Sequence, residues 1–176
     1  MSSKIASVVV ALGLASGVVL AQGKPTDPQI AHIAYTAGTI DIDAAKQALQ
    51  MSKSKDVRAF AEQMVKDHEA VNKQALDLCK KLGVTPEDND TSKSLAAAAK
   101  AKRDELAKMS GAAFDKAYID NEVAYHKNVN GALETTLIPS AQNAQLKSLL
   151  QTGLKIFQGH EQHAEMAASM VKSSAR

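Results

Sequence analysis

The chain has 176 residues, with 21 lysines and arginines against 19 aspartates and glutamates, and its formal net charge is +2. This near balance gives no electrostatic reason to expect nucleic acid as a partner. Cys79 is the only cysteine, so no disulfide can form within the chain. Alanine, leucine and lysine are abundant and aromatic residues are few, a composition that favours helices over sheets.

Residues 1–21 have the pattern of a signal peptide. A short polar start that carries Lys4 precedes an apolar run over residues 5–20, and the small residue Ala21 stands at the expected cleavage position. An uncleaved anchor is the alternative, but a membrane span needs about 20 apolar residues. We therefore expect a periplasmic or secreted protein without a transmembrane segment in the mature chain. Such a protein could associate with the cell envelope. Residues 22–27 would form a linker.

Apolar residues recur at helical spacing over residues 28–172, which predicts one all-α domain. The first helix is expected over residues 28–51 and the second over residues 56–82, where Gly83 would end it. Because the connection between these helices is very short, they should form an antiparallel hairpin.

The second half of the chain predicts another hairpin. Residues 92–109 could form a short helix of their own or the first part of the third helix. The third helix is expected over residues 112–137, with Pro139 ending it. The fourth begins shortly afterwards and runs to about residue 171, before a polar tail over residues 173–176. Two hairpins joined by a longer crossing make a four-helix bundle.

Four polar residues occupy positions where the helical stripes require apolar side chains. Asp41 lies on the first helix, His68 on the second, His126 on the third and His160 on the fourth. Carboxylate and imidazole metal sites in bundles are built in this way, with one ligand-type residue from each helix. Glu122 precedes His126 by four residues and could reach a common ion. It could equally be a solvated residue at the edge of the stripe.

Helical rise indicates which of these residues share a layer. Asp41 and His68 lie about 13 residues on either side of the first turn, so they should face one another. His126 lies 13 residues before Pro139, whereas His160 lies 17 to 21 residues beyond the second turn. This offset corresponds to roughly 6 to 12 Å along the axis. Either the fourth helix begins late, or His160 lies in another layer.

The arrangement of several short motifs resembles a known family. Gly38 and Asp41 lead through Ala45 and Ser52 to the run Asp56-Val57-Arg58-Ala59-Phe60-Ala61, Met64-Val65 and Asp67-His68, and the second half has Phe114-Asp115, Tyr118-Ile119, His126 and His160. Over about residues 28–171 this pattern is similar to the family catalogued as domain of unknown function 4142. The resemblance implies a ferritin-like four-helix domain in exported or envelope proteins of bacteria, with no established activity. Where that family usually has glutamate on the first helix, this chain has the shorter Asp41.

Two functions are compatible with these observations. The first is an exported binding module that holds zinc, copper, nickel or iron through His68, His126 and His160, with Asp41 or Glu122. The second is a structural or stress-related envelope protein in which the same histidine cluster only sets the packing and binds no ligand. An enzyme is the less expected class, because the sequence contains no nucleophile with a nearby base, no phosphate loop and no haem-attachment motif.

Overall fold

The computed structural model describes residues 23–174, with side chains through Val171. The expected signal peptide over residues 1–21 and the end of the expected polar tail lie outside the described residues. The elements in chain order are α1 (Asp27–Met51), α2 (Lys55–Leu82), α3 (Asp90–Leu106), α4 (Gly111–Ala132), the π-helical turn η1 (Leu133–Leu137), α5 (Ile138–Ser140) and α6 (Ala144–Ser174).

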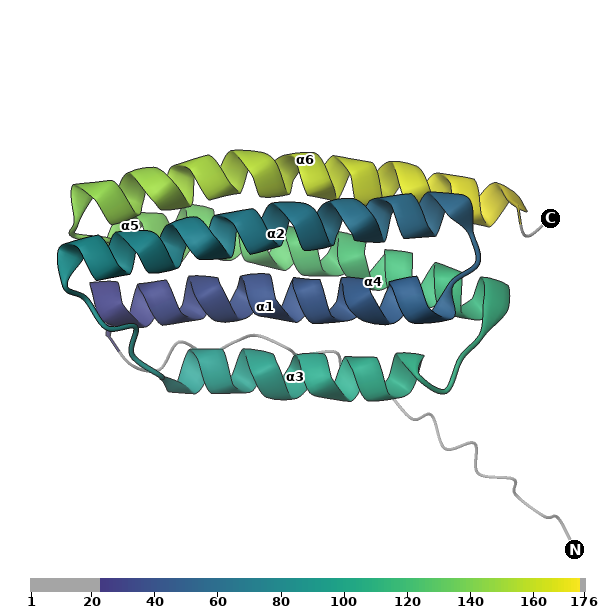
Figure 1. Cartoon of the computed structure of the whole chain (residues 1–176), viewed down its shortest axis with the longest axis horizontal. Helices are drawn as coiled ribbons and strands as arrows, with labels where there is room; N and C mark the ends of the chain where they lie inside the picture. The colour runs from purple at the N-terminus through teal and green to yellow at the C-terminus, as the bar shows by residue number, and fades with distance from the viewer. Residues whose placement is uncertain (1–22, 175–176) are drawn as a thin grey trace, which may run out of the picture.

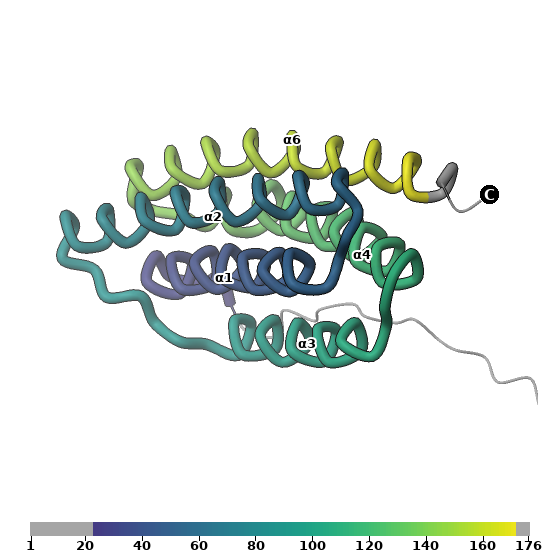
Figure 2. The backbone as a smooth tube through the Cα atoms, turned by 45° about the vertical axis from the view of Figure 1, so that its right-hand side comes forward, coloured from purple at the N-terminus to yellow at the C-terminus, as the bar shows by residue number. Residues whose placement is uncertain are grey.

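The long helices pack as two hairpins, α1 with α2 and α4 with α6, while α3 lies along the outer side of α1 (Figures 1 and 2). The predicted all-α bundle is therefore confirmed. Of the two alternatives for residues 92–109, a separate helix is correct. None of the helices over the described residues combines the length and apolar character that a membrane span requires.

Local capping explains where α1 and α2 begin and end. At the start of α1, the Thr26 hydroxyl accepts a hydrogen bond from the Gln29 amide, and the Gln29 side chain accepts one from the Thr26 amide. This reciprocal pair satisfies two backbone donors that have no partner within the helix. At the end of α2, Gly83 adopts the left-handed conformation with φ 63°, which stops the helix as predicted.

The third helical segment ends beside Pro139 as predicted, since helical structure continues through η1 and α5 to Ser140, one residue past the proline. In η1 the Ile138 amide donates to the Leu133 carbonyl five residues earlier. This wider π-type turn precedes the proline, which has no amide hydrogen to donate. The next helix, α6, begins only at Ala144, where the Asn143 side chain accepts hydrogen bonds from the first free amides.

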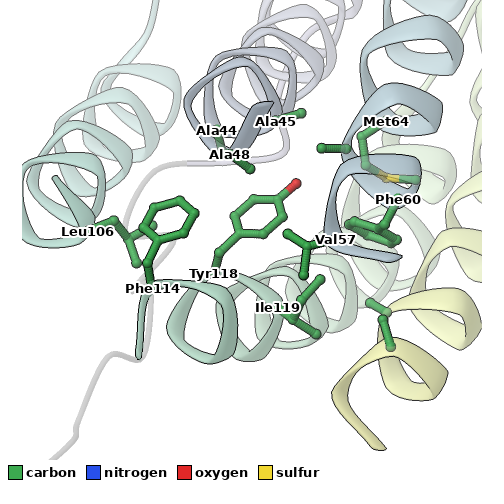
Figure 3. Packing of buried hydrophobic residues seen from close by; sticks show 13 residues of the cluster. Ala44, Ala45, Ala48, Val57, Phe60, Met64, Leu106, Phe114, Tyr118 and Ile119 are labelled. Atoms are coloured by element: carbon green, nitrogen blue, oxygen red, sulfur yellow. The ribbon is translucent and has the colours of Figure 1, made fainter. Parts of the chain in front are cut away.

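Buried apolar side chains form two clusters at opposite ends of the bundle. The Tyr118 cluster lies at the end where α1 joins α2 and is drawn in Figure 3; it comprises Ala44, Ala45, Ala48, Val57, Phe60, Ala61, Met64, Leu106, Phe114, Tyr118, Ile119, Ala164 and Ala167. The Leu133 cluster comprises Ile30, Ile33, Leu133, Leu137, Ala141, Leu146, Leu150 and Phe157. On each of α1, α4 and α6, the residues between these two clusters include the polar residues singled out by the sequence.

Candidate metal centre

All five predicted site residues are buried in the layer between the two apolar clusters. The exposed fraction is 1 % for Asp41, Glu122 and His126, 2 % for His160 and 3 % for His68. Of the two readings of Glu122, the structure agrees with the one that turns it inward. His160 lies in the same layer as His126, with their ring centroids 5.5 Å apart. Helix α6 begins late, at Ala144, and this brings His160 level with His126. Of the two alternatives for His160, the late start of the fourth helix is therefore correct.

Asp41 is the carboxylate that two of the imidazoles face. Its Oδ2 atom lies 3.4 Å from Nε2 of His68 and 3.3 Å from Nε2 of His126. Glu122 approaches the other side of the His126 ring, with Oε2 3.8 Å from Nδ1. The His68 ring centroid is 5.2 Å from that of His160 and 5.9 Å from that of His126, so the three rings surround one small region.

Hydrogen bonds assign the free nitrogen on two of the three histidines. Nδ1 of His126 lies 3.0 Å from the Glu122 carbonyl oxygen, which can only accept, so Nδ1 carries the proton. The lone pair of His126 is therefore on Nε2, which faces Asp41. Nε2 of His160 donates to Oδ2 of Asp67 at 3.0 Å, and this leaves its lone pair on Nδ1. A carboxylate or carbonyl behind an imidazole in this way is typical of metal-ligating histidines.

Most of the remaining side-chain nitrogen and oxygen atoms of the site make no hydrogen bond. These include Oδ2 of Asp41, although its distances to the His68 and His126 nitrogens would allow a hydrogen bond. Buried polar atoms are nearly always paired, and an unpaired one costs about 1–3 kcal/mol. Seven such atoms belong to the five site residues: Oδ1 and Oδ2 of Asp41, Nδ1 and Nε2 of His68, Oε2 of Glu122, Nε2 of His126 and Nδ1 of His160.

The ligand-type atoms form two groups of three that share His126, and each group has the spacing of a metal site. One nitrogen from each of His68, His126 and His160 lies within 4.8 Å of the other two, and the same limit holds for ligand atoms of Asp41, Glu122 and His126. Ligands at 2.0–2.1 Å from a tetrahedral zinc lie about 3.3 Å apart. The contacts of 3.3 and 3.4 Å between Asp41 and the two imidazoles match this separation.

Burial determines the protonation of the cluster. It raises the pKa of Asp41 to about 8, and together with the charge of Asp41 it raises the pKa of Glu122 well above its usual range. Burial also lowers the pKa of His68 to about 2 and that of His126 to about 4, and it lowers the pKa of His160 against the opposing effect of Asp67. Near neutral pH the imidazoles are therefore uncharged, which is the form that binds metals.

Sequence reasoning gave no role to two residues that support the site. Asp67 orients His160 from a partly exposed position, its side chain being 30 % accessible. The Phe157 ring stacks on His68 with centroids 4.7 Å apart and planes inclined by 9°. Adjacent residues on a helix point about 100° apart, so a stripe that contains His68 excludes Asp67. The only signal was the Asp67-His68 pair within the family-like motif.

The fold and this cluster define an all-α bundle with imidazole and carboxylate groups gathered in its core. The chain belongs to the family described as domain of unknown function 4142, whose model matches residues 17–167. The family resemblance is thereby confirmed, while the ferritin-like and bacterial assignments that it implied stay predictions. No curated protein and no solved structure matches the chain.

Proposed function

We propose that this protein is an exported binder of one divalent transition-metal ion in the core of its bundle. His68, His126 and His160 would supply three imidazole nitrogens and Asp41 a carboxylate oxygen, with Glu122 as a further ligand or a charge partner. The observation that carries this proposal is that two groups of buried ligand-type residues, His68 with His126 and His160 and Asp41 with Glu122 and His126, meet at His126 and contain seven unpartnered polar atoms.

The charge of the site supports a divalent ion. Three neutral imidazoles with the ionised carboxylates of Asp41 and Glu122 carry two negative charges. A divalent cation would bring the buried layer to neutrality, which avoids the high cost of burying an uncompensated charge. Metal binding would release the protons that the carboxyl groups hold when the site is empty.

A purely structural histidine cluster fits the geometry less well. Such a cluster stabilises a core when its members satisfy one another by hydrogen bonds. Here Asp41 lies beside His68 and His126 within 3.4 Å, yet its side-chain oxygens make no hydrogen bond. The histidines instead use their outward nitrogens for hydrogen bonds, His126 to a backbone carbonyl and His160 to Asp67.

Zinc is the first ion to test, since the donor spacing matches a tetrahedral site and zinc accepts mixed histidine and carboxylate ligands. Copper, nickel and iron also bind imidazole and remain candidates for the same test. Export is supported by the N-terminal pattern of Lys4, the apolar run over residues 5–20 and Ala21. A mature protein that begins at Gln22 and fractionates outside the cytoplasm would agree with export.

The deciding experiment is elemental analysis of the protein purified without chelator or affinity tag, followed by titration of the metal-free protein with zinc. We expect one equivalent of metal, and its loss in both His68→Ala and His126→Ala. His163→Ala is the matched control, because His163 lies on α6 only three residues after His160 and hydrogen-bonds Gln63 rather than the cluster. Absence of metal, with none gained on titration with zinc or in parallel titrations with copper, nickel and iron, would leave a structural cluster and contradict the proposal.

A further inference from the structure

An apolar cavity of about 50 Å³ lies inside the bundle, on the side of the site that faces the Leu133 cluster. Residues from α1, α2, α4, η1 and α6 line it, and because some of them, such as Ala34, Val71 and Ala75, are only partly buried, the cavity is partly open toward the bundle surface. Small residues leave this space where larger side chains would fill a bundle core: Ala34 and Ala37 from α1, Ala75 from α2 and Gly153 from α6.

The lining offers almost nothing to a polar molecule. Its polar members are the thiol of Cys79 and the side chain of Asn72. The donor side of the Asn72 amide is already engaged, since Nδ2 donates to the Tyr35 carbonyl and to the Thr39 hydroxyl, both at 3.3 Å, which leaves Oδ1 as its one acceptor. A buried water needs two to four polar partners, and cavities lined by hydrocarbon stay dry. Water is therefore a poor occupant.

The volume limits the size of an occupant. An engineered apolar cavity of about 150 Å³ binds benzene or xenon, so a cavity of about 50 Å³ has room for a few atoms only. A molecule of two to four non-hydrogen atoms would fit, whereas a lipid chain or an aromatic cofactor would not. The scarcity of available hydrogen-bonding groups favours uncharged molecules that make no hydrogen bonds.

One residue connects the cavity with the candidate metal centre. Phe157 lines the cavity, and the same ring stacks on His68 at 4.7 Å. A Cβ atom placed on Gly153 would lie 3.4 Å from this ring, at ordinary van der Waals distance, so Gly153 packs directly beside Phe157. Phe157 is thus shared by the cavity lining and by the contact with the imidazole of His68.

We propose that the apolar cavity is a binding site for one small, uncharged, apolar molecule of about the size of dioxygen, held next to the site layer. The proposal goes beyond metal binding, because the cavity walls and the ion's ligands are different residues. It assigns a role to the small residues of α1, α2 and α6, which otherwise forgo apolar contacts that a larger side chain would make.

Xenon is the probe for this site, since it is apolar and enters dry hydrocarbon cavities. In a xenon titration of the metal-free protein followed by amide chemical shifts, we expect saturable changes confined to residues around the cavity. Ala34→Leu and Ala75→Leu fill the cavity from two different helices, so a folding defect in one variant leaves the other informative. Both should abolish the saturable response.

His126→Ala separates this proposal from the proposed function, because it removes a candidate metal ligand that does not line the cavity. That variant should bind xenon as the unmodified protein does. Shift changes that rise linearly without saturation, or that persist in both cavity-filling variants, would overturn the cavity proposal. A negative metal analysis would leave the xenon result unaffected.

Discussion

At the scale of single residues, the cluster is unusual in holding carboxyl and imidazole groups side by side in uncharged form. Near neutral pH the Asp41 carboxyl stays protonated because burial raises its pKa to about 8. The His68 imidazole stays neutral because burial lowers its pKa to about 2. Desolvation is the main cause in both cases, since it disfavours whichever form is charged. The side chains of the metal-free site are therefore uncharged at neutral pH. Because of these pKa shifts, the stability of the folded protein depends on pH.

The first prediction concerns Asp41 in the metal-free protein. In the unfolded chain this carboxyl ionises near its ordinary pKa of 3.8, whereas the folded protein holds the proton until pH about 8. The stabilisation that this group contributes is complete below pH 3.8 and is lost as pH rises through about 8. Between pH 5 and 8 the free energy of unfolding should fall, relative to Asp41→Asn, by about 1.4 kcal/mol per pH unit.

Urea unfolding of both chains at half-unit pH steps measures this difference. The asparagine variant has no proton to lose, and the histidine contributions common to both chains cancel. Parallel stability curves for the two proteins would contradict the assigned pKa of Asp41.

At the scale of elements, the close approach of α1 and α2 holds Asp41 opposite His68. Gly38 lies one turn before Asp41, and Asn72 lies one turn after His68. A Cβ atom on Gly38 would come within 2.2 Å of Oδ1 of Asn72, so the absence of a side chain there lets the two helices meet. The Asn72 amide in turn donates to Tyr35 and Thr39 of α1, which secures the pair beside the site.

Gly38→Ala should therefore destabilise the protein by about 1–3 kcal/mol, the usual cost of overpacking. Asn72 could yield only by giving up its hydrogen bonds to α1. Gly159→Ala is the matched control: it lies in α6, nothing stands within 4 Å of the added Cβ, and helix propensity should make it stabilising by about 0.5–1 kcal/mol. Chemical denaturation compares the two, and changes of the same sign would refute the role of Gly38 as a contact point.

Much of this arrangement could be predicted from the sequence, and the exceptions have physical causes. Apolar spacing reveals the helices, and helical rise places Asp41 opposite His68 because both are counted from the same short turn. The same count could not place His160 in the second hairpin, because the sequence left open where the fourth helix begins; the π-type turn η1 before Pro139 was also not predicted. The start of α6 is fixed by Asn143 and by Asp27, which accepts hydrogen bonds from the Gln142 and Asn143 amides 115 and 116 residues away.

At the scale of the whole molecule, the candidate centre divides one bundle core into two apolar halves. The Tyr118 cluster packs on one side of the layer and the Leu133 cluster on the other, and each draws residues from both hairpins. An ion in this layer would join all four long helices through its ligands, whereas the metal-free protein must hold the same layer together around unpaired polar atoms.

Metal should consequently stabilise the entire fold. At a free metal concentration about 100 times the dissociation constant, the gain is about 2.7 kcal/mol, which for a domain of this size raises Tm by roughly 5–10 °C. Thermal unfolding of the metal-free protein with and without zinc measures the shift. His68→Ala should show none, and an equal rise in that variant would mean that the ion acts elsewhere.

The depth of the layer also bears on how an ion is acquired and kept. Every candidate ligand is at most 3 % exposed, so an ion could leave only when the helices part. Its residence time would then follow the opening rate of the bundle, which for small domains ranges from seconds to days, rather than the strength of its bonds to the ligands. A folded chain would then take up or exchange its ion slowly, so the titrations need long equilibration, and the metal content after synthesis would reflect the compartment in which the chain folded.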